Sequence, residues 1–393
     1  QQQVHSSRLS CTAGWVPQQH RIELFVIRDR DVIVMSDYVP AKRFFAEYHG
    51  HTVPHLRMVH RGLKARGYES FIFLAGDSSL DNKHWLFPEG RAKINCDFND
   101  DSWTGCALNG YQYVLRPPRM VKDVSYWLNL QIDKNKPQVN NDDGKSGSLV
   151  ACINASVEES ALFDRENDKL LPQDVFIRES ITENDILLVS VGGNDIALKP
   201  TCCTIFNMAW LIFCSCTCCI RYLSCGCAFP CCGCGFPPGL GHFIHMFKTK
   251  VENFVKRITS KKKPKKVVVC MIYFLDERPG GSWADRVLAT LGYDTNPEKL
   301  QTMIKQVFRL ATQRINIPGT EVVAYPLFKV LDGKNTDDYD HRVEPSVSGG
   351  QKMGEALYRE LFFGMPHQKS HQKEDYGTIE NERSSEEDLK KQN

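Results

Sequence analysis

The sequence has little net charge, which excludes one broad class of function. Its 393 residues include 49 Lys and Arg against 47 Asp and Glu, a formal net charge of +2. No global field therefore attracts nucleic acid, and we expect no nucleic-acid partner. The composition, 42% hydrophobic and 24% charged, is that of a globular protein long enough to bury a large core.

The sequence also lacks a starting methionine and a signal-peptide pattern. It begins Gln-Gln-Gln, so we expect a fragment, a processed form or an incomplete gene model. The printed residues contain no charged region followed by a short apolar run, which a secretory signal requires. A missing upstream piece is where such a signal would lie.

Two common fingerprints of active sites are absent. The nearest string to the Gly-x-Ser-x-Gly of α/β-hydrolases runs from Gly144 to Ser148 and fails at its fifth position. The same region lacks the upstream glycine of a phosphate-binding loop. We therefore look elsewhere for a nucleophile.

The 16 cysteines are unevenly placed. Eleven lie between Cys202 and Cys234, and five are scattered along the rest of the chain. Scattered cysteines of this kind predict buried, unreactive thiols in a reducing compartment, which favours a cytoplasmic or membrane-associated protein. The five are Cys11, Cys96, Cys106, Cys152 and Cys270.

The clustered cysteines have several interpretations. They fit an S-acylated segment or an apolar lid over the active site, a soft-metal site, or disulfides. Cys216/Cys219 and Cys231/Cys234 form two C-x-x-C pairs, although their separation is shorter than in zinc ribbons. The apolar stretch 205–223 is near the lower length of a membrane span, but its charge and polar residues argue against a full span and favour a surface-lying or re-entrant segment.

Short apolar runs alternate with helical patterns, which predicts an α/β protein with a parallel sheet covered on both faces. Such sheets bind ligands at the carboxyl ends of their strands. The predicted strands are 70–75, 148–153, 185–191, 267–274 and 321–327. The predicted helices are 41–66, 172–181, 242–259, 297–315 and 350–363.

Composition divides the chain into segments. We expect an N-terminal extension over 1–40, one domain over 41–365, and a disordered charged tail over 366–393. Two insertions interrupt the domain. Residues 88–147 are polar and rich in Gly, Asn and Asp, so we expect little regular structure there, and 200–241 is the Cys-rich apolar insertion.

Ser78 directly follows the first predicted strand in the segment Gly76-Asp77-Ser78-Ser79. A serine in a tight turn into a helix presents its oxygen, while its own N–H faces a developing oxyanion. It needs a general base to act as a nucleophile. The alternative is that Asp77 and Ser78 only cap the next helix.

Asn194 ends another predicted strand, in Gly192-Gly193-Asn194-Asp195. A side-chain amide at this edge can donate a neutral hydrogen bond to an oxyanion, typically worth about 3 kcal/mol. The alternative is an ordinary Gly-Gly-Asn-Asp turn.

Asp338 and His341 lie in an Asp-x-x-His spacing between the last predicted strand and the last predicted helix. This loop can bring His341 to Ser78, with Asp338 orienting the imidazole. The alternative is a solvated loop histidine.

Together the three segments resemble the GDSL/SGNH hydrolase family. G-D-S-S-L matches its nucleophile block, G-G-N-D its asparagine block and the Asp-x-x-His loop its last block, over about residues 68–363. The resemblance implies a three-layer α/β/α sandwich with a flavodoxin-like five-stranded parallel sheet. It also implies hydrolysis of esters or thioesters without a cofactor. The oxyanion hole would consist of the Ser78 N–H, a backbone N–H of a second block and the Asn194 amide.

Two departures from the family pattern matter. The second block, 154–158, lacks the usual glycine, so Ala155 or Ser156 would have to supply the N–H. In the last block the residue before Pro345 is Glu344, where the family has its histidine. His341 as base therefore requires a three-residue shift, and Glu344 is the alternative base, which needs a raised pKa to serve.

The sequence therefore predicts an esterase or lipase-like acyl hydrolase acting on a small ester or a lipid. Ser78 is the nucleophile, His341 with Asp338 the base, and Asn194 with the Ser78 N–H the oxyanion hole, with no metal and no cofactor. The Cys-rich insertion makes a membrane surface a further expected partner. The alternative function is a catalytically weak or inactive SGNH-fold protein that serves as a membrane-associated or metal-binding module.

Overall fold

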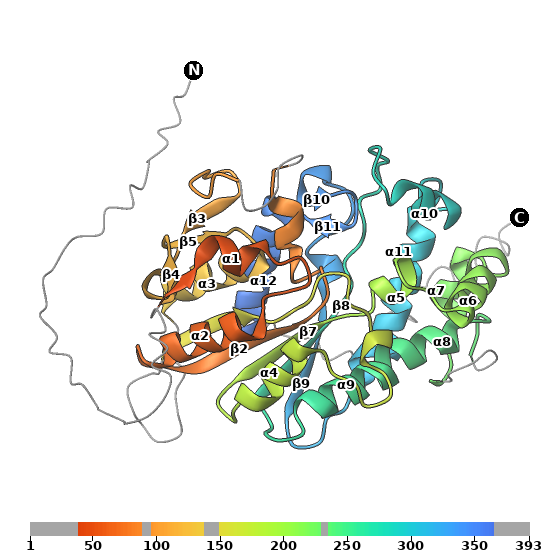
Figure 1. Ribbon diagram of the computed structural model, residues 1–393. Coiled ribbons are helices and arrows are strands. Elements are labelled where there is room, and N and C mark those ends of the chain that lie inside the picture. The colour runs from red at the N-terminus through yellow and green to blue at the C-terminus, as the bar shows by residue number, and fades with distance from the viewer. Residues whose placement is uncertain (1–37, 89–95, 137–148, 229–234, 365–393) are drawn as a thin grey trace, which may run out of the picture.

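Five parallel strands form the central sheet of the computed structural model, which describes residues 38–88, 96–136, 149–228 and 235–364. The strands lie in the order β6-β2-β7-β8-β9 (Figure 1). Strand β2 comes first of these five along the chain, and it pairs with β6 and β7, the second and third. This is the order of flavodoxin-like doubly wound sheets. The predicted α/β class with a parallel sheet is confirmed. The strands are β2 (Tyr68–Gly76), β6 (Leu149–Asn154), β7 (Ile186–Ser190), β8 (Lys266–Met271) and β9 (Glu321–Pro326).

The apolar run of β2 is continuous because both faces of the strand are covered. Phe71 and Phe73 belong to one buried cluster, whereas Ile72 and Leu74 belong to a second cluster on the opposite face. Side chains alternate between the faces of a strand, so a strand buried on both sides has no polar positions in its middle.

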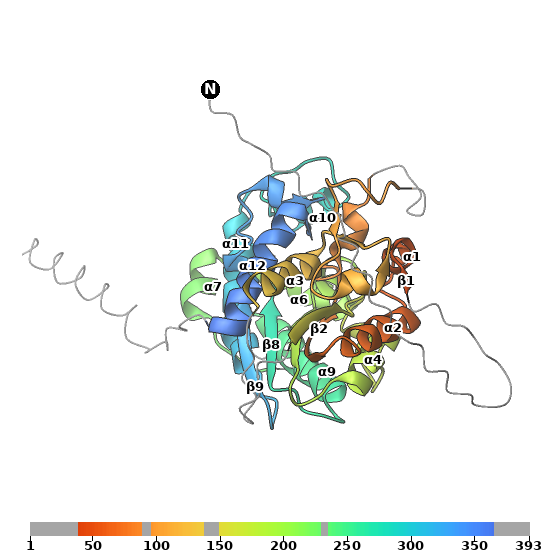
Figure 2. The same ribbon diagram turned by 90° about the vertical axis from the view of Figure 1, so that its left-hand side faces the viewer.

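Helices cover both faces of the sheet. The first cluster includes buried side chains of α2 (Val53–Lys64), α4 (Pro172–Ser180) and α9 (Val251–Ile258). The second includes those of α3 (Val124–Asn135) and α12 (Val347–Phe363), which pack against each other (Figure 2).

The remaining elements connect this framework. The short strands are β1 (Val39–Pro40), β3 (Thr104–Cys106), β4 (Leu115–Arg116), β5 (Arg119–Val121), β10 (Tyr339–Asp340) and β11 (Glu344–Pro345). The α-helices are α1 (Ala41–Ala46), α5 (Asn194–Ala197), α6 (Cys202–Phe213), α7 (Thr217–Leu223), α8 (Leu240–Ile244), α10 (Asp285–Thr290) and α11 (Pro297–Leu310). The other helical turns are η1 (Asn82–Leu86), η3 (Tyr111–Tyr113), η4 (Phe163–Arg165), η5 (His245–Lys250), η6 (Thr312–Arg314), η7 (Leu327–Lys329) and η8 (Thr336–Asp338).

The long helix predicted over 41–66 is instead two helices, α1 and α2. The chain breaks at Gly50, which has a φ of +76°, and Pro54 then stands in the first turn of α2. Proline is tolerated in a first turn but not inside a helix, so it favours a new start here.

The expectation of little regular structure over 88–147 is wrong. This segment contains β3, β4, β5 and the twelve-residue helix α3. Asp123 caps α3 by accepting a hydrogen bond from the Tyr126 N–H, and Leu128 and Ile132 reach the second cluster. The polar residues around the helix concealed its apolar spacing.

Several predictions lie outside the described residues. They concern residues 1–37 of the expected N-terminal extension, the expected tail over 366–393, and Cys11. Among the other scattered cysteines, Cys96, Cys152 and Cys270 are buried and form no disulfide. Cys106 is disulfide-bonded, so the expectation of a free thiol is wrong for this residue.

Candidate functional site

The turn after β2 presents Ser78 at the carboxyl end of the sheet. The Asp77 N–H donates to Ser190 O of the neighbouring strand β7, and a Cβ on Gly76 would lie 1.8 Å from that same oxygen. Only glycine therefore fits at position 76. Leu80 and Asp81 then donate backbone hydrogen bonds to Asp77 O, which closes the turn around Ser78.

The Ser78 hydroxyl donates a hydrogen bond to Glu344. The distance from Oγ to Oε1 is 3.1 Å, and both side chains are buried. Asn82 helps to hold this arrangement, because its Nδ2 donates to Pro345 O at 2.7 Å while its own segment directly follows the turn that carries Ser78. The structure thus brings the first and last blocks of the sequence pattern together through Glu344.

Glu344 lies in a buried and acidic environment. Burial raises the pKa of its carboxyl from 4.5 to about 8, and the nearby Asp77 charge adds to this, while the hydrogen bond from Ser78 opposes it. Burial also raises the pKa of Glu158, with a further contribution from Glu344. The Oε2 atoms of both glutamates are buried and have no hydrogen-bond partner among the described residues. A carboxyl with a raised pKa is a stronger base when it is ionised.

Asn194 begins α5 and borders the same cavity as Ser78. Its Nδ2 donates to Ser160 O at 3.0 Å. The preceding Gly193 lies close to the turn that carries Ser78, because a Cβ on Gly193 would lie 4.0 Å from Asp77 Oδ2. The Ser78 N–H donates to no acceptor among the described residues.

The second block does not have a free N–H at the expected positions. Ala155 N donates to Leu74 O at 3.0 Å, and Ser156 N donates to its neighbour Asn154 Oδ1 at 3.0 Å. The chain therefore satisfies both groups internally, which leaves Ser78 N–H and the Asn194 amide as the candidate oxyanion donors.

A buried arginine holds the turn that carries Ser78 in place. Arg165 forms an ion pair with Asp174, with 2.9 Å between Nε and Oδ2, and also donates to Gly76 O at 3.1 Å. Asp195 fixes the adjacent loop because its carboxylate accepts hydrogen bonds from Leu162 N and Phe163 N. Within the G-G-N-D segment, Asp195 therefore stabilises the neighbouring loop.

Neither His341 nor Asp338 forms a hydrogen bond with Ser78 in the described part of the chain. The Asp338 carboxylate accepts from Lys352 Nζ at 2.6 Å and from Ser348 Oγ at 3.1 Å, not from His341. His341 Nε2 lies 3.6 Å from Asp340 Oδ1, and its ring packs edge-on against Trp85. His341 is not among the residues that line the cavity, whereas Glu344 is.

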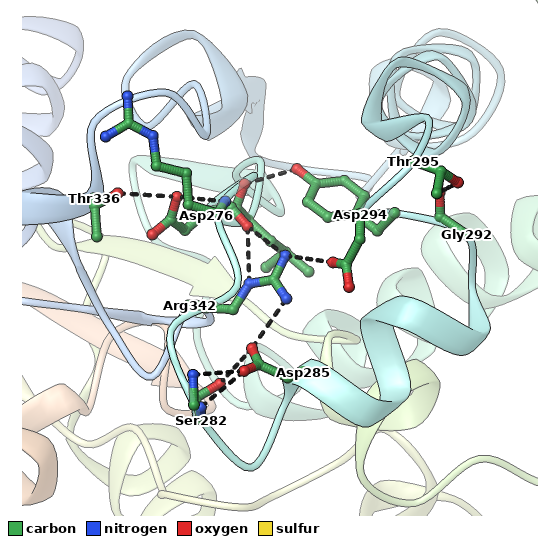
Figure 3. Close-up of polar contacts among 12 residues, drawn as sticks. Asp276, Ser282, Asp285, Gly292, Asp294, Thr295, Thr336 and Arg342 are labelled. Atoms are coloured by element: carbon green, nitrogen blue, oxygen red, sulfur yellow. Dashed lines mark hydrogen bonds and ion pairs between the residues drawn. The ribbon is translucent and has the colours of Figure 1, made fainter.

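Arg342 fixes the loop that carries Glu344 (Figure 3). Its buried guanidinium donates to Asp285 at 3.0 Å and to Asp294 at 2.8 Å, and also to the backbone oxygen of Asp276. Asp276 N in turn donates to Arg342 O at 3.0 Å. These contacts join the Glu344 loop to α10, which forms one wall of the cavity.

The cavity beside Ser78 has a volume of about 120 Å³. Its polar end consists of Ser78, Asn194 and Glu344. Most of the remaining wall is apolar and comes from α5, α10, α11 and the segment after β8, including Ile196, Ile272, Leu275, Val287, Leu288, Leu300 and Ile304. Such a wall suits an apolar group attached to a polar reacting centre.

The structure brings three thiols of the Cys-rich segment together. Cys216 Sγ lies 2.7 Å from Cys218 Sγ and 2.8 Å from Cys219 Sγ, and hydrogen bonding from Cys218 lowers the pKa of the Cys216 thiol. The described cysteines of the cluster, from Cys202 to Cys227, form no disulfides. The predicted Cys231/Cys234 pair lies outside the described residues.

The Cys-rich segment lies beside the cavity rather than over it. None of its described residues lines the cavity, so the lid interpretation is not supported there. Within the described part of the chain, no single helix has the length and apolar composition to cross a membrane. The pair α6 and α7 passes that test together but bends by 103° at its break.

No family model matches the chain, and no curated protein matches it. Several solved structures are similar to the chain at low identity and with low TM-scores. The lipase Lip_vut3 from a goat rumen metagenome is 10% identical with a TM-score of 0.38, covering 75% of this chain and 97% of that one. The carbohydrate acetylesterase Est24 from Sinorhizobium meliloti is 9% identical with a TM-score of 0.37, covering 75% and 98%. The M. smegmatis aryl esterase is 11% identical with a TM-score of 0.33, covering 74% and 98%.

Sequence reasoning missed Glu158 and Arg342 as members of the site. Glu158 stands in the second block, whose family pattern predicts only a backbone N–H donor. Arg342 stands directly between His341 and Val343. The signal that could have found them is a charged residue in a segment at the carboxyl edge of the sheet. Charged residues are rarely buried there without a partner or a function.

Proposed function

We propose that this chain is a serine ester hydrolase with an SGNH-type three-layer α/β/α fold, in which Ser78 is the nucleophile and Glu344 the general base. The observation that carries the proposal is the 3.1 Å hydrogen bond from Ser78 Oγ to Glu344 Oε1 at the polar end of an apolar cavity. The proposal replaces the predicted His341–Asp338 pair with the alternative base.

The reaction proceeds in two stages. Ser78 Oγ attacks the ester carbonyl carbon while its proton passes to Glu344, and the oxyanion accepts hydrogen bonds from the Ser78 N–H and the Asn194 amide. Glu344 then returns the proton to the leaving alkoxide as the C–O bond breaks. In the second stage Glu344 takes a proton from water, which attacks the acyl carbon. Glu344 then returns that proton to Ser78 Oγ as the acyl C–Oγ bond breaks, which releases the acid and regenerates Ser78.

The raised pKa of Glu344 supports this assignment. An ordinary carboxylate is too weak a base to activate a serine, but burial among acidic groups raises the pKa of Glu344 to about 8. The apolar wall favours esters with an apolar acyl group, a class that includes lipids.

The test is active-site labelling with a fluorophosphonate probe. We expect the wild-type protein to be labelled and Ser78→Ala to lose all labelling, while Ser79→Ala keeps it. Persistent labelling of Ser78→Ala would show that another residue is the nucleophile.

A second comparison separates the two candidate bases. Glu344→Gln removes the proton acceptor with little change in shape, so we expect the rate of ester hydrolysis to fall roughly 10²–10⁴-fold. His341→Ala should keep most of the wild-type rate. The reverse ranking would make His341 the base.

A second candidate function rests on the three thiols of Cys216, Cys218 and Cys219, whose sulfur atoms all lie within 4.8 Å of one another. Thiolates select soft metals such as zinc and copper(I). Titration of the full chain with Zn²⁺ against a chromophoric chelator tests this candidate. We expect one site that Cys216→Ser abolishes, whereas hydrolysis stays unchanged in that variant.

A further inference from the structure

Helix α6 buries two polar residues beside Leu211 and exposes several large apolar ones. Its inward face carries the buried polar residues Thr204 and Asn207, and Thr204 Oγ1 lies 3.1 Å from His242 Nε2. Its outward face carries Phe206, Trp210 and Phe213, which are exposed. A surface helix in water normally presents the opposite arrangement.

The exposed apolar side chains continue beyond α6. Eight of the fourteen large apolar side chains exposed among the described residues lie between Leu198 and Phe236. The set is Leu198, Ile205, Phe206, Trp210, Phe213, Tyr222, Leu223 and Phe236, and we call it the α6/α7 apolar surface. Exposed apolar side chains gathered on one segment in this way suit contact with a protein partner or a membrane.

Charge distinguishes between these partners. Residues 196–251 contain no Asp or Glu. The nearby basic residues Lys199 and Arg221 are already paired, with Asp164 and Glu298 of other segments. No carboxylate of this segment would therefore repel an anionic or zwitterionic lipid headgroup. Its Trp and Tyr side chains also suit the boundary between water and lipid.

The α6/α7 apolar surface also adjoins the walls of the cavity. Helix α6 contacts α5, whose Ile196 lines the cavity, and α7 packs against α11, whose Leu300 and Ile304 line it as well. Figure 1 shows α6 and α7 together at one edge of the molecule beside these helices. A lipid surface on this edge would lie close to the apolar end of the cavity.

We propose that the α6/α7 apolar surface inserts into the interfacial layer of a lipid bilayer and holds the protein there as a peripheral membrane protein. The helices lie along the surface, so that their aromatic side chains enter the lipid and the parallel sheet stays in water. This attachment is independent of hydrolysis at Ser78.

Vesicle co-sedimentation tests the proposal, with the full-length Ser78→Ala protein so that lipid turnover plays no part. Vesicles of phosphatidylcholine with one fifth phosphatidylserine should sediment the protein, and the binding should persist in 0.5 M NaCl because it is apolar. Phe206→Gln/Phe213→Gln should weaken the binding at least tenfold. The matched control is Tyr113→Gln/Phe363→Gln, which removes aromatic side chains with exposures of 54% and 73%, against 48% and 77% for the test pair.

Quenching by brominated lipids gives a second readout. Trp210 fluorescence should be quenched on binding, and Trp210→Phe should lose that part of the signal. Three results would overturn the proposal. The first is binding that salt abolishes and the test pair leaves unchanged, which would indicate electrostatic binding through the basic segment 261–266, Lys-Lys-Lys-Pro-Lys-Lys. The second is a dimer in sedimentation that only the test pair dissociates, with no vesicle binding. The third is no vesicle binding at all.

Discussion

A carboxyl group is an effective base toward a serine only when its conjugate acid is weak. Glu344 meets this condition because burial raises its pKa to about 8, whereas an imidazole would reach a similar basicity with little help from its surroundings. The cost is that most Glu344 side chains are protonated at pH 7. The proposed enzyme would therefore work below its full rate at neutral pH.

This condition predicts the pH dependence of the reaction. Glu344 must be ionised to accept the Ser78 proton, so we expect kcat/KM to rise with pH along a single limb centred near pH 8. Hydrolysis of p-nitrophenyl acetate between pH 5.5 and 10, corrected for spontaneous hydrolysis, measures it. A limb near pH 6.5 that disappears in His341→Ala would contradict the assignment.

The proposed oxyanion hole depends strongly on one side chain, because Ala155 and Ser156 use their N–H groups within the protein. We expect Asn194→Ala to lower kcat roughly 10²–10³-fold, the usual effect of removing one such donor. Thermal melting serves as the control, since the same substitution also removes a hydrogen bond to Ser160 O. A small loss of kcat with a large loss of stability would make Asn194 a structural residue only.

At the scale of elements, the contact between α3 and α12 depends on a glycine. A Cβ on Gly354 would lie 2.6 Å from Trp127 Cβ and 2.8 Å from Leu128 N, so the helices approach closely at this point. A Cβ on Gly350, one turn earlier in α12, would meet Trp127 Cδ1 at an ordinary 3.5 Å. The two glycines form a matched pair on the same helix.

We expect Gly354→Ala to destabilise the protein by roughly 1–3 kcal/mol, as overpacking typically does, because backbone atoms of α3 cannot give way. Gly350→Ala should be neutral or stabilising by up to about 1 kcal/mol, since alanine is the better helix former. Urea unfolding measures both. Equal effects of the two substitutions would show that α3 and α12 are free to separate.

The sequence predicted the strands of the central sheet better than its insertions. Buried parallel strands such as β2 and β7 are continuous apolar runs, which are visible without any partner. Helix α3 was missed because polar turns surround it and because its buried residues include the polar Ser125 and Asn129, which interrupt the apolar spacing. The positions of Ser78 and Asn194 follow from the ends of the strands. The contact between Ser78 and Glu344 spans 266 residues, and no local pattern specifies which loop residue reaches the serine.

At the scale of the whole molecule, buried acidic groups link stability to pH. Burial raises the pKa of Asp123, Asp185 and Asp195 to about 6, besides raising those of Glu344 and Glu158. Each group holds a proton in the folded protein at pH values where the unfolded chain has released it. Each therefore contributes stability in acid that is lost as the pH rises toward its folded pKa.

Buried histidines act in the opposite direction at lower pH. Burial lowers the pKa of His60 to about 4 and that of His51 well below 6.5, so the unfolded chain binds more protons than the folded one below pH 6.5. This contribution makes stability rise with pH up to about 6.5 and offsets the three aspartates. Above pH 6.5 the histidines are neutral in both states. The two buried glutamates then lower the stability as the pH rises, and they outweigh the opposite contribution of the exposed Cys216 thiol, whose pKa is lowered.

We therefore expect the free energy of unfolding to fall between pH 6.5 and 8, by up to about 1.4 kcal/mol per pH unit for each proton held only by the folded protein. Glu344→Gln and Glu158→Gln should each flatten this fall, because glutamine cannot release a proton. Glu159→Gln is the matched control, since Glu159 is the sequence neighbour of Glu158 and is partly exposed. Urea unfolding at pH 6.5, 7.25 and 8 measures the slope. A stability that rises over this range, or a slope unchanged in both buried variants, would mean that Glu344 is ionised in the folded protein at neutral pH.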